Sequence, residues 1–176
     1  MDIEFVAASA DLPAKSALAR VVFEGAALEG AAAQAAAASR FTGAKGQTLD
    51  ILAPAGLDAA RLVLIGAGKP EAHDAMGAEH AAASAYAAVK ASGLTTLRIE
   101  LPNGGKANAA RAALGVRLAS YRFDKYRTKE AEEKKPSVIK TQIVTPDIDA
   151  ALADFAPLAA LADAVSFTRD LVSEPP

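Results

Sequence analysis

The stretch Arg61-Leu62-Val63-Leu64-Ile65-Gly66 decides the fold. Its four large apolar residues follow one another without alternation, which is typical of a strand that is covered on both faces. The turn sequence Gly66-Ala67-Gly68-Lys69 comes directly after it. A helix is predicted next, over Asp74–Ser92, because Asp is a good N-cap residue and the Gly that follows Ser92 is a C-cap signal. A strand, a turn and a helix in this order form the repeating unit of a parallel sheet.

The same alternation of strand and helix extends to both sides of this unit. Apolar runs predict three further strands, and weaker runs predict two more: Asp2–Ala7, Leu94–Leu101, Ser137–Thr145, Ala19–Phe23 and Gln47–Leu52. Helical spacing predicts three further helices: Ala26–Arg40, Lys106–Tyr126 and 154–171. We therefore expect an α/β fold of three layers, with a mostly parallel, mixed sheet and helices on both faces.

The last predicted helix has an apolar stripe. Pro157 suits the first turn of this helix better than its middle. Four apolar residues of the stripe are expected to lie on the sheet: Phe155, Leu158, Leu161 and Val165.

Composition sets limits on function. Of the 176 residues, 52% are hydrophobic and 23% are charged, which predicts one packed domain. The formal net charge of −2 gives no reason to expect a polyanion as partner. Cysteine is absent, which excludes disulfides and thiolate metal sites. The start lacks the features of a signal peptide, and no apolar stretch long enough to span a bilayer is free of charge, so we expect a cytoplasmic protein without a membrane partner.

The glycine turn after the buried strand does not complete a nucleotide-binding motif. The dinucleotide fingerprint needs a third glycine where Glu71 stands. The phosphate-binding loop needs a glycine where Val63 stands and a hydroxyl residue where Pro70 stands. We interpret the stretch as a tight turn between strand and helix.

The two histidines do not form a metal site. His73 and His80 are seven residues apart, whereas a zinc-binding pair on a helix is spaced four apart. We expect both side chains to be solvated or packed. Neither a Ser-His-Asp set nor a carboxylate pair can be argued from the sequence, so no catalytic, cofactor-binding or metal-binding residue is predicted.

Aromatic and basic residues alternate over Tyr121–Arg127. This pattern is typical of a platform for single-stranded nucleic acid. Three acidic residues follow at Glu130, Glu132 and Glu133 and reduce the local positive charge. We favour the interpretation that the aromatic residues fix the end of a helix to the sheet, and expect no nucleic-acid partner.

Four segments together resemble the N-terminal domain of the leucyl aminopeptidases, the cytosol aminopeptidase family of two-domain metallopeptidases. The last of them is the most specific, because it is similar to the segment that joins the two domains of that family. Thr168 stands there in place of the usual Ala, and Ser173 in place of the usual Asn. The segments are Phe41–Leu49, Arg61–Gly68, Gly115–Arg127 and Thr168–Pro176.

The resemblance implies that this chain and a second domain have different roles. The fold would be similar to a macro domain, with residues 1–167 as the N-terminal domain and 168–176 as the start of a linker to an absent catalytic domain. That second domain would hold two divalent metals, zinc or manganese, and release N-terminal amino acids. This chain would contain no metal ligand or catalytic residue and would hydrolyse no peptide. It would contact its own catalytic domain and its neighbours in a hexamer, and serve assembly and access to the site.

Two further consequences concern the chain on its own. Without a catalytic domain it is expected to be mainly a monomer. Leu171 and Val172, in the joining segment, would lack cover, so the last turn of the final helix would open easily. Two alternatives remain open: a free-standing macro-like module that binds ADP-ribose or another nucleotide in the loop after Ile65, and a nucleic-acid-binding module that uses Arg122, Lys125 and Arg127.

Overall fold

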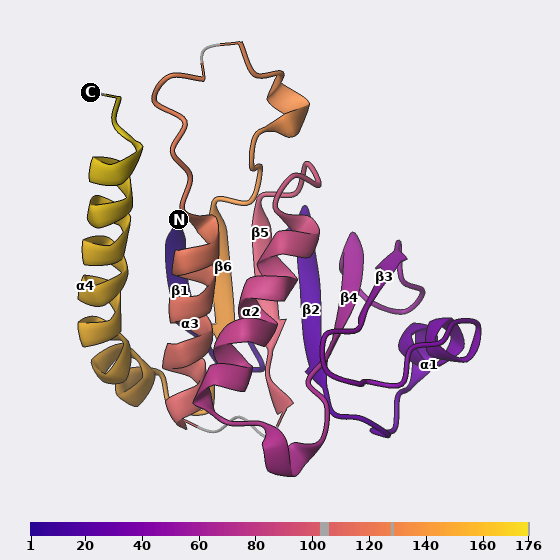
Figure 1. Ribbon diagram of the computed structural model, residues 1–176. Helices are drawn as coiled ribbons and strands as arrows, with labels where there is room; N and C mark the ends of the chain where they lie inside the picture. The colour runs from indigo at the N-terminus through magenta and orange to yellow at the C-terminus, as the bar shows by residue number, and fades with distance from the viewer. Residues whose placement is uncertain (103–105, 128, 176) are drawn as a thin grey trace.

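A six-stranded mixed sheet forms the centre of the computed structural model, which describes residues 1–102, 106–127 and 129–175. The strand order is β1-β6-β5-β2-β4-β3, and β3 alone among these strands runs antiparallel to its neighbour (Figure 1). The mostly parallel, mixed sheet that the sequence predicts is confirmed. The strands are β1 Asp2–Val6, β2 Ser16–Val22, β3 Thr48–Leu52, β4 Arg61–Gly66, β5 Thr96–Glu100 and β6 Lys140–Val144.

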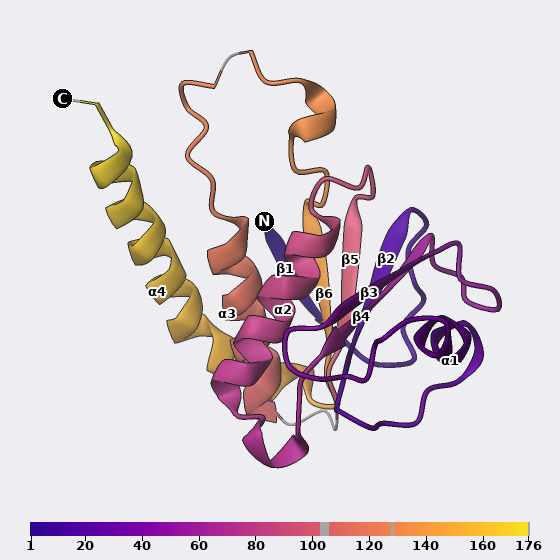
Figure 2. The same ribbon diagram turned by 45° about the vertical axis from the view of Figure 1, so that its right-hand side comes forward.

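Helices cover both faces of the sheet. Two of them, α2 and α3, lie side by side across one face, and α4 lies beside α3 at the β1 edge (Figures 1 and 2). The short helix α1 packs on the opposite face, near β3. The helices are α1 Gly30–Ala37, α2 Ala75–Val89, α3 Lys106–Ser120 and α4 Ile148–Ser173, with short 3-10 turns at Pro70–Ala72 and Glu132–Lys134.

The strand β4 is buried on both faces, as its sequence predicts. Val63 and Ile65 pack in the larger core, with alanines of α2 and α3. Leu62 and Leu64 point the other way and pack with Ala32 of α1. Successive residues of a strand face opposite sides, so an apolar run without alternation requires cover on both sides.

Small residues let the helices α2 and α3 approach closely. Their shared surface is mainly alanine. At Gly115, an added Cβ atom would lie 2.1 Å from the backbone oxygen of Glu79. Many of the chain's alanines thus lie in the contact between α2 and α3. Gly115 lies where the two helices are too close for the side chain of alanine.

Several element boundaries differ from the prediction because tertiary contacts override local sequence preference. The weak strand signal at Ala19–Phe23 belongs to β2, which begins at Ser16 and lies in the middle of the sheet. The helix predicted over Ala26–Arg40 is shorter, Gly30–Ala37. The helix predicted to reach Tyr126 ends at Ser120, and the chain beyond it extends toward the end of α4.

The last helix also begins earlier than predicted. Asp147 is its N-cap, and the Oδ1 atom of Asp147 accepts a hydrogen bond from the backbone N–H of Ala150 at 3.0 Å. Pro157 therefore lies inside the helix and not in its first turn, so the expectation for this residue is wrong. A proline within a helix removes one backbone hydrogen bond, and α4 remains helical on both sides of Pro157.

Candidate functional site

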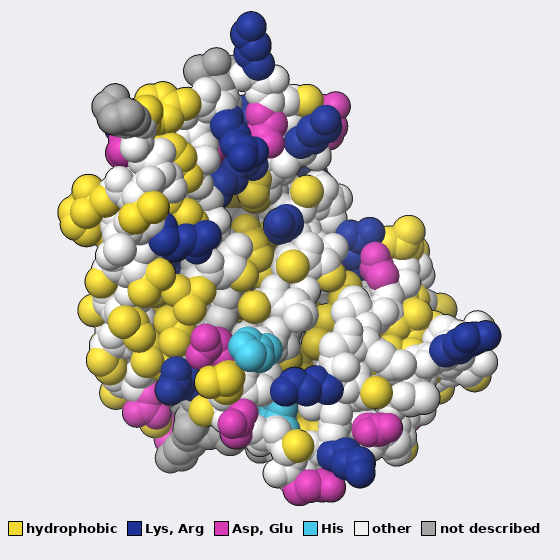
Figure 3. All heavy atoms as spheres, in the orientation of Figure 1, with side chains coloured by type: hydrophobic (Ala, Val, Ile, Leu, Met, Phe, Trp, Pro, Cys, Tyr) yellow, Lys and Arg dark blue, Asp and Glu magenta, His cyan; other side chains and the backbone are white. Residues whose placement is uncertain are grey.

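The outer side of α4 exposes large apolar residues. Phe167 is 64% exposed and Val172 is 83% exposed. Figure 3 shows hydrophobic side chains gathered over α4, on the left of the molecule. Exposed apolar residues gathered on one helix are typical of an interaction site. We call this surface the outer face of α4; its residues are Leu161, Phe167, Leu171 and Val172.

The inner side of α4 is packed mainly on α3. Ala151 and Ala162 are buried there, and the ring of Phe155 meets that of Phe5 edge to face, with the centroids 5.7 Å apart. Arg117 of α3 binds the carboxylate of Asp163. The prediction that the apolar stripe covers the sheet is wrong for Leu161, which is 51% exposed, because α4 lies beside α3 at the sheet edge.

By length and composition alone, α4 is apolar enough to cross a membrane, as a core helix of a soluble protein can also be. Polar contacts instead tie it to the rest of the fold along its length. Arg117 binds Asp163 near its middle, and Tyr121 binds Asp170 near its end. These contacts hold α4 against the rest of the domain.

The aromatic and basic segment 121–127 is fixed to the end of α4. The hydroxyl of Tyr121 donates to the Oδ1 atom of Asp170 at 2.8 Å, and the guanidinium of Arg169 lies 3.9 Å from the centroid of the Tyr121 ring. The ammonium of Lys125 donates to the Oε1 atom of Glu174 at 2.6 Å. The packing interpretation placed these aromatic residues at a helix end against the sheet, whereas they lie in a non-helical segment against α4.

The carboxylates of α4 and of the nearby loop engage most of the positive charge in this segment. Hydrogen bonds from Lys125 and Tyr126 lower the pKa of Glu174. Arg122 binds the carboxylate of Glu130. Two of the three cations proposed for nucleic-acid binding, Arg122 and Lys125, are therefore already paired within the domain.

The glycine turn after β4 uses its backbone donors inside the fold. The N–H groups of Gly66, Ala67 and Gly68 donate to backbone oxygens of Gln47, Val22 and Gly43, at 2.8, 2.8 and 2.9 Å. An added Cβ at Gly66 would lie 2.1 Å from a neighbouring backbone oxygen. A phosphate cradle needs free N–H groups, and those of these three residues are occupied by the loop that precedes β3 and by the end of β2.

The two histidines lie in different surroundings. The ring of His73 meets Phe23 edge to face at 5.4 Å, and burial lowers the pKa of His73. His80 lines a hollow of about 230 Å³ together with Lys45 and Ser84. Among the described residues, no group of three or more His, Asp or Glu side chains is placed to hold a metal ion.

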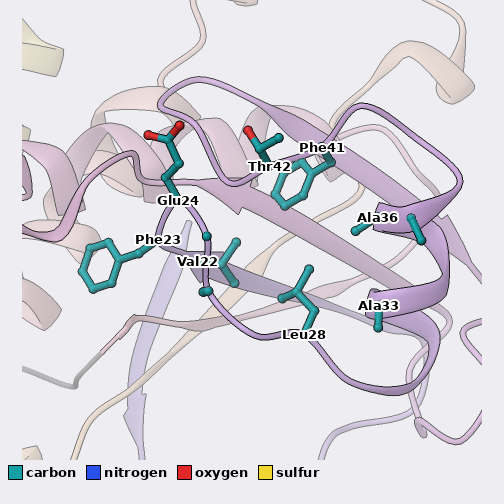
Figure 4. Close-up of a pocket in the computed structure, with 11 residues that line it drawn as sticks. Val22, Phe23, Glu24, Leu28, Ala33, Ala36, Phe41 and Thr42 are labelled. Carbon is teal, nitrogen blue, oxygen red and sulfur yellow. The ribbon is translucent and has the colours of Figure 1, made fainter.

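A hollow of about 530 Å³ lies between the end of β2 and α1 (Figure 4). Val22, Leu28 and Phe41 line it with apolar surface, while the side chains of Glu24 and Thr42 point away from its centre. An apolar lining without converging polar groups offers no acid, base or nucleophile to a substrate.

Residues 8–130 match the N-terminal domain of the cytosol aminopeptidase family. A probable cytosol aminopeptidase of Caulobacter vibrioides is 52% identical over 99% of this chain and 38% of its own length. A second, of Rhodopseudomonas palustris, is 43% identical over 78% of this chain and 28% of its own length. The chain belongs to the cytosol aminopeptidase family. It spans about a third of the length of these relatives.

Solved structures agree with this assignment to the cytosol aminopeptidase family. A mutant of tomato leucine aminopeptidase shares the fold, with a TM-score of 0.78, 20% identity, and coverage of 99% of this chain and 38% of that chain. The bottromycin maturation enzyme BotP in complex with Mn has a TM-score of 0.71 and 25% identity, and covers 93% of this chain and 32% of its own. The resemblance drawn from the four sequence segments is confirmed.

Only part of the apolar surface is predicted by the sequence. Leu171 and Val172 are predicted to lack cover, and both are exposed. Phe167 is not among the predicted residues. The spacing of Phe167 and Leu171, four residues apart, places them on one face of a helix and could have indicated a second apolar face.

Proposed function

We propose that this chain is the non-catalytic part of a metal-dependent aminopeptidase, and that it holds a catalytic part through the outer face of α4. The observation that carries the proposal is the exposed apolar side of a helix that ends in the family's joining segment. Because the relatives are about three times as long as the matched region, a second part of the protein is the natural cover for this surface.

We place the boundary between the two parts at residue 168, where the family's joining segment begins. The helix α4 continues without interruption from Ile148 to Ser173, so the first residues of the connection are helical. A helical connection transmits a fixed orientation, whereas a flexible linker does not. Residues 1–167 would then be the accessory domain and 168–176 the start of the connection.

The chemistry is assigned to the catalytic part. Two divalent metals, zinc or manganese, would activate water there for the release of N-terminal amino acids. The described residues of this chain do not fit such a site, since none of their His, Asp and Glu side chains form a ligand group of three. We assign no catalytic, cofactor-binding or metal-binding residue to this chain.

The same proposal includes the assembly of the whole protein and its location in the cell. The accessory domain would lie at the outside of a hexamer centred on the catalytic parts and would shape access to their sites. A cytoplasmic location is supported by the relatives, which are named cytosol aminopeptidases.

A hydrolysis assay tests this assignment. The 176-residue chain is compared with a fusion in which Pro176 is followed by the remaining part of the Caulobacter vibrioides relative. With zinc or manganese added, leucine p-nitroanilide should be cleaved by the fusion and not by the chain alone. A rate that scales with the concentration of the chain alone and survives repurification would overturn the proposal.

A further inference from the structure

A second hollow, of about 510 Å³, lies where the segment 121–127 meets the last turns of α4. Three arginines line it, together with aromatic and small polar side chains. Val172, from the outer face of α4, forms part of the same lining. The hollow is therefore continuous with the apolar surface. The arginines are Arg122, Arg127 and Arg169.

The three arginines differ in their partners. Arg122 is held by Glu130 and also lies 3.6 Å from Asp124. Among the described residues, no carboxylate pairs with the side chain of Arg127 or Arg169. Two acidic groups at the end of α4 are already engaged, because Asp170 accepts from Tyr121 and Glu174 accepts from Lys125.

Stacking sets the orientation of Arg169. Its guanidinium lies over the Tyr121 ring at 3.9 Å from the centroid. A guanidinium that stacks on an aromatic face keeps its N–H donors free in its own plane, where a carboxylate can accept two of them. The guanidinium of Arg169 is thus oriented to donate to an acceptor, and the described residues do not supply one.

We propose that this hollow receives an acidic side chain of the catalytic part, which Arg127 and Arg169 bind while Leu171 and Val172 are covered. This inference rests on the proposed function. A single carboxylate fits better than a nucleic-acid backbone, because the neighbouring cations Arg122 and Lys125 are already paired with Glu130 and Glu174 and leave Arg127 and Arg169 for an acceptor, too few for a row of phosphates. Covering the apolar residues would also remove water from the ion pair and strengthen it.

Zero-length cross-linking tests the inference. A carbodiimide joins a lysine to a carboxylate that touches it, so Arg127→Lys is introduced into the fusion with the Caulobacter vibrioides relative and into the 176-residue chain. We expect Lys at this position to be joined to an Asp or Glu beyond residue 176 in the fusion. Arg111→Lys is the matched control, because Arg111 pairs with Glu79 at 3.3 Å and should be joined to Glu79 in both proteins.

A second variant covers the case in which lysine is too short to reach the acceptor. Arg127→Glu should lower the unfolding midpoint of the fusion and leave that of the 176-residue chain unchanged. The inference is overturned if the fusion shows neither the cross-link nor a lowered unfolding midpoint while the end of α4 is protected from hydrogen exchange. The proposed function would stand in that case. An unprotected end of α4 in the fusion would overturn both. Absence of the cross-link together with binding of a single-stranded DNA oligonucleotide at physiological salt, lost in Arg127→Glu, would also overturn the inference.

Discussion

Arg98 shows how a charged residue is accommodated near the centre of the sheet. It lies in β5 and is only 5% exposed. Its guanidinium donates to the side chain of Gln142 and to the backbone oxygens of Ala10 and Asp11. The loop after β1 is thereby fixed over a polar part of the sheet face. An arginine between apolar residues gives no sign of these partners in the sequence, because they are distant along the chain.

Replacing Arg98 should therefore be costly. Arg98→Leu would leave Gln142 and two backbone oxygens without their donor, and we expect a loss of about 2–3 kcal/mol in the free energy of unfolding. Arg111→Leu is the control, since its ion pair with Glu79 is partly exposed and should contribute less than about 1 kcal/mol. Chemical denaturation measures both values. Equal effects of the two substitutions would contradict this account of Arg98.

His73 should make stability depend on pH. Burial lowers its pKa below the ordinary value of 6.5, while Asp74 acts in the opposite direction and Lys45 lowers it further. The unfolded chain then takes up a proton more readily than the folded one, so stability is complete above pH about 6.5 and falls as the pH drops through the folded pKa. His73→Phe, which keeps a ring beside Phe23, should lose less stability between about pH 7 and pH 5. Denaturation curves with the same slope against pH for both proteins would refute the prediction.

The elements were predictable to different degrees. The buried strand β4 was predicted within its observed bounds, because an unbroken run of large apolar residues that ends at a glycine turn is typical of a strand covered on both faces. The central strand β2 was underestimated, because Arg20 and two alanines interrupt its apolar pattern, and Arg20 is accommodated by Glu100 of the neighbouring strand at 2.8 Å. The end of α3 was predicted too late, since the contact of Tyr121 with Asp170 of α4 is not visible in local sequence.

At Gly115, helix propensity and helix packing predict opposite effects of a substitution on stability. Alanine is favoured over glycine inside a helix by about 1 kcal/mol, so propensity alone predicts that Gly115→Ala stabilises the protein. The added methyl would lie 2.1 Å from the backbone oxygen of Glu79, so we expect a net loss of about 1–3 kcal/mol. Gly77→Ala is a milder comparison, because its methyl would meet the movable side chain of His73. Stabilisation by Gly115→Ala would mean that the two helices are not held this closely.

At the scale of the whole molecule, family membership was predicted from the order and spacing of four segments. The surface that remains for a partner was predicted only at Leu171 and Val172, because the joining segment marks them. The full extent of the outer face of α4 depends on which side of the helix meets α3, and this packing is a property of the folded molecule.

The 176-residue chain should be mainly a monomer in solution. In the proposed function a hexamer would be centred on the catalytic parts, so the main contacts between subunits would be missing from this chain. Weak self-association through the outer face of α4 is the expected departure, and Phe167→Ser should reduce it. Size-exclusion chromatography with light scattering measures the mass, and a stable hexamer of the chain alone would refute the prediction.

Hydrogen exchange at the end of α4 tests the central claim most directly. If the outer face of α4 is the docking surface for the catalytic part, the backbone N–H groups of Arg169–Ser173 should exchange faster in the 176-residue chain than those of Val63–Ile65, because surface contacts with the segment 121–127 hold this end of α4 less firmly than the core holds β4. In the fusion with the remaining part of the Caulobacter vibrioides relative, the same groups at the end of α4 should become protected. The account predicts that gain in protection; equal exchange at Arg169–Ser173 in the two proteins would contradict it.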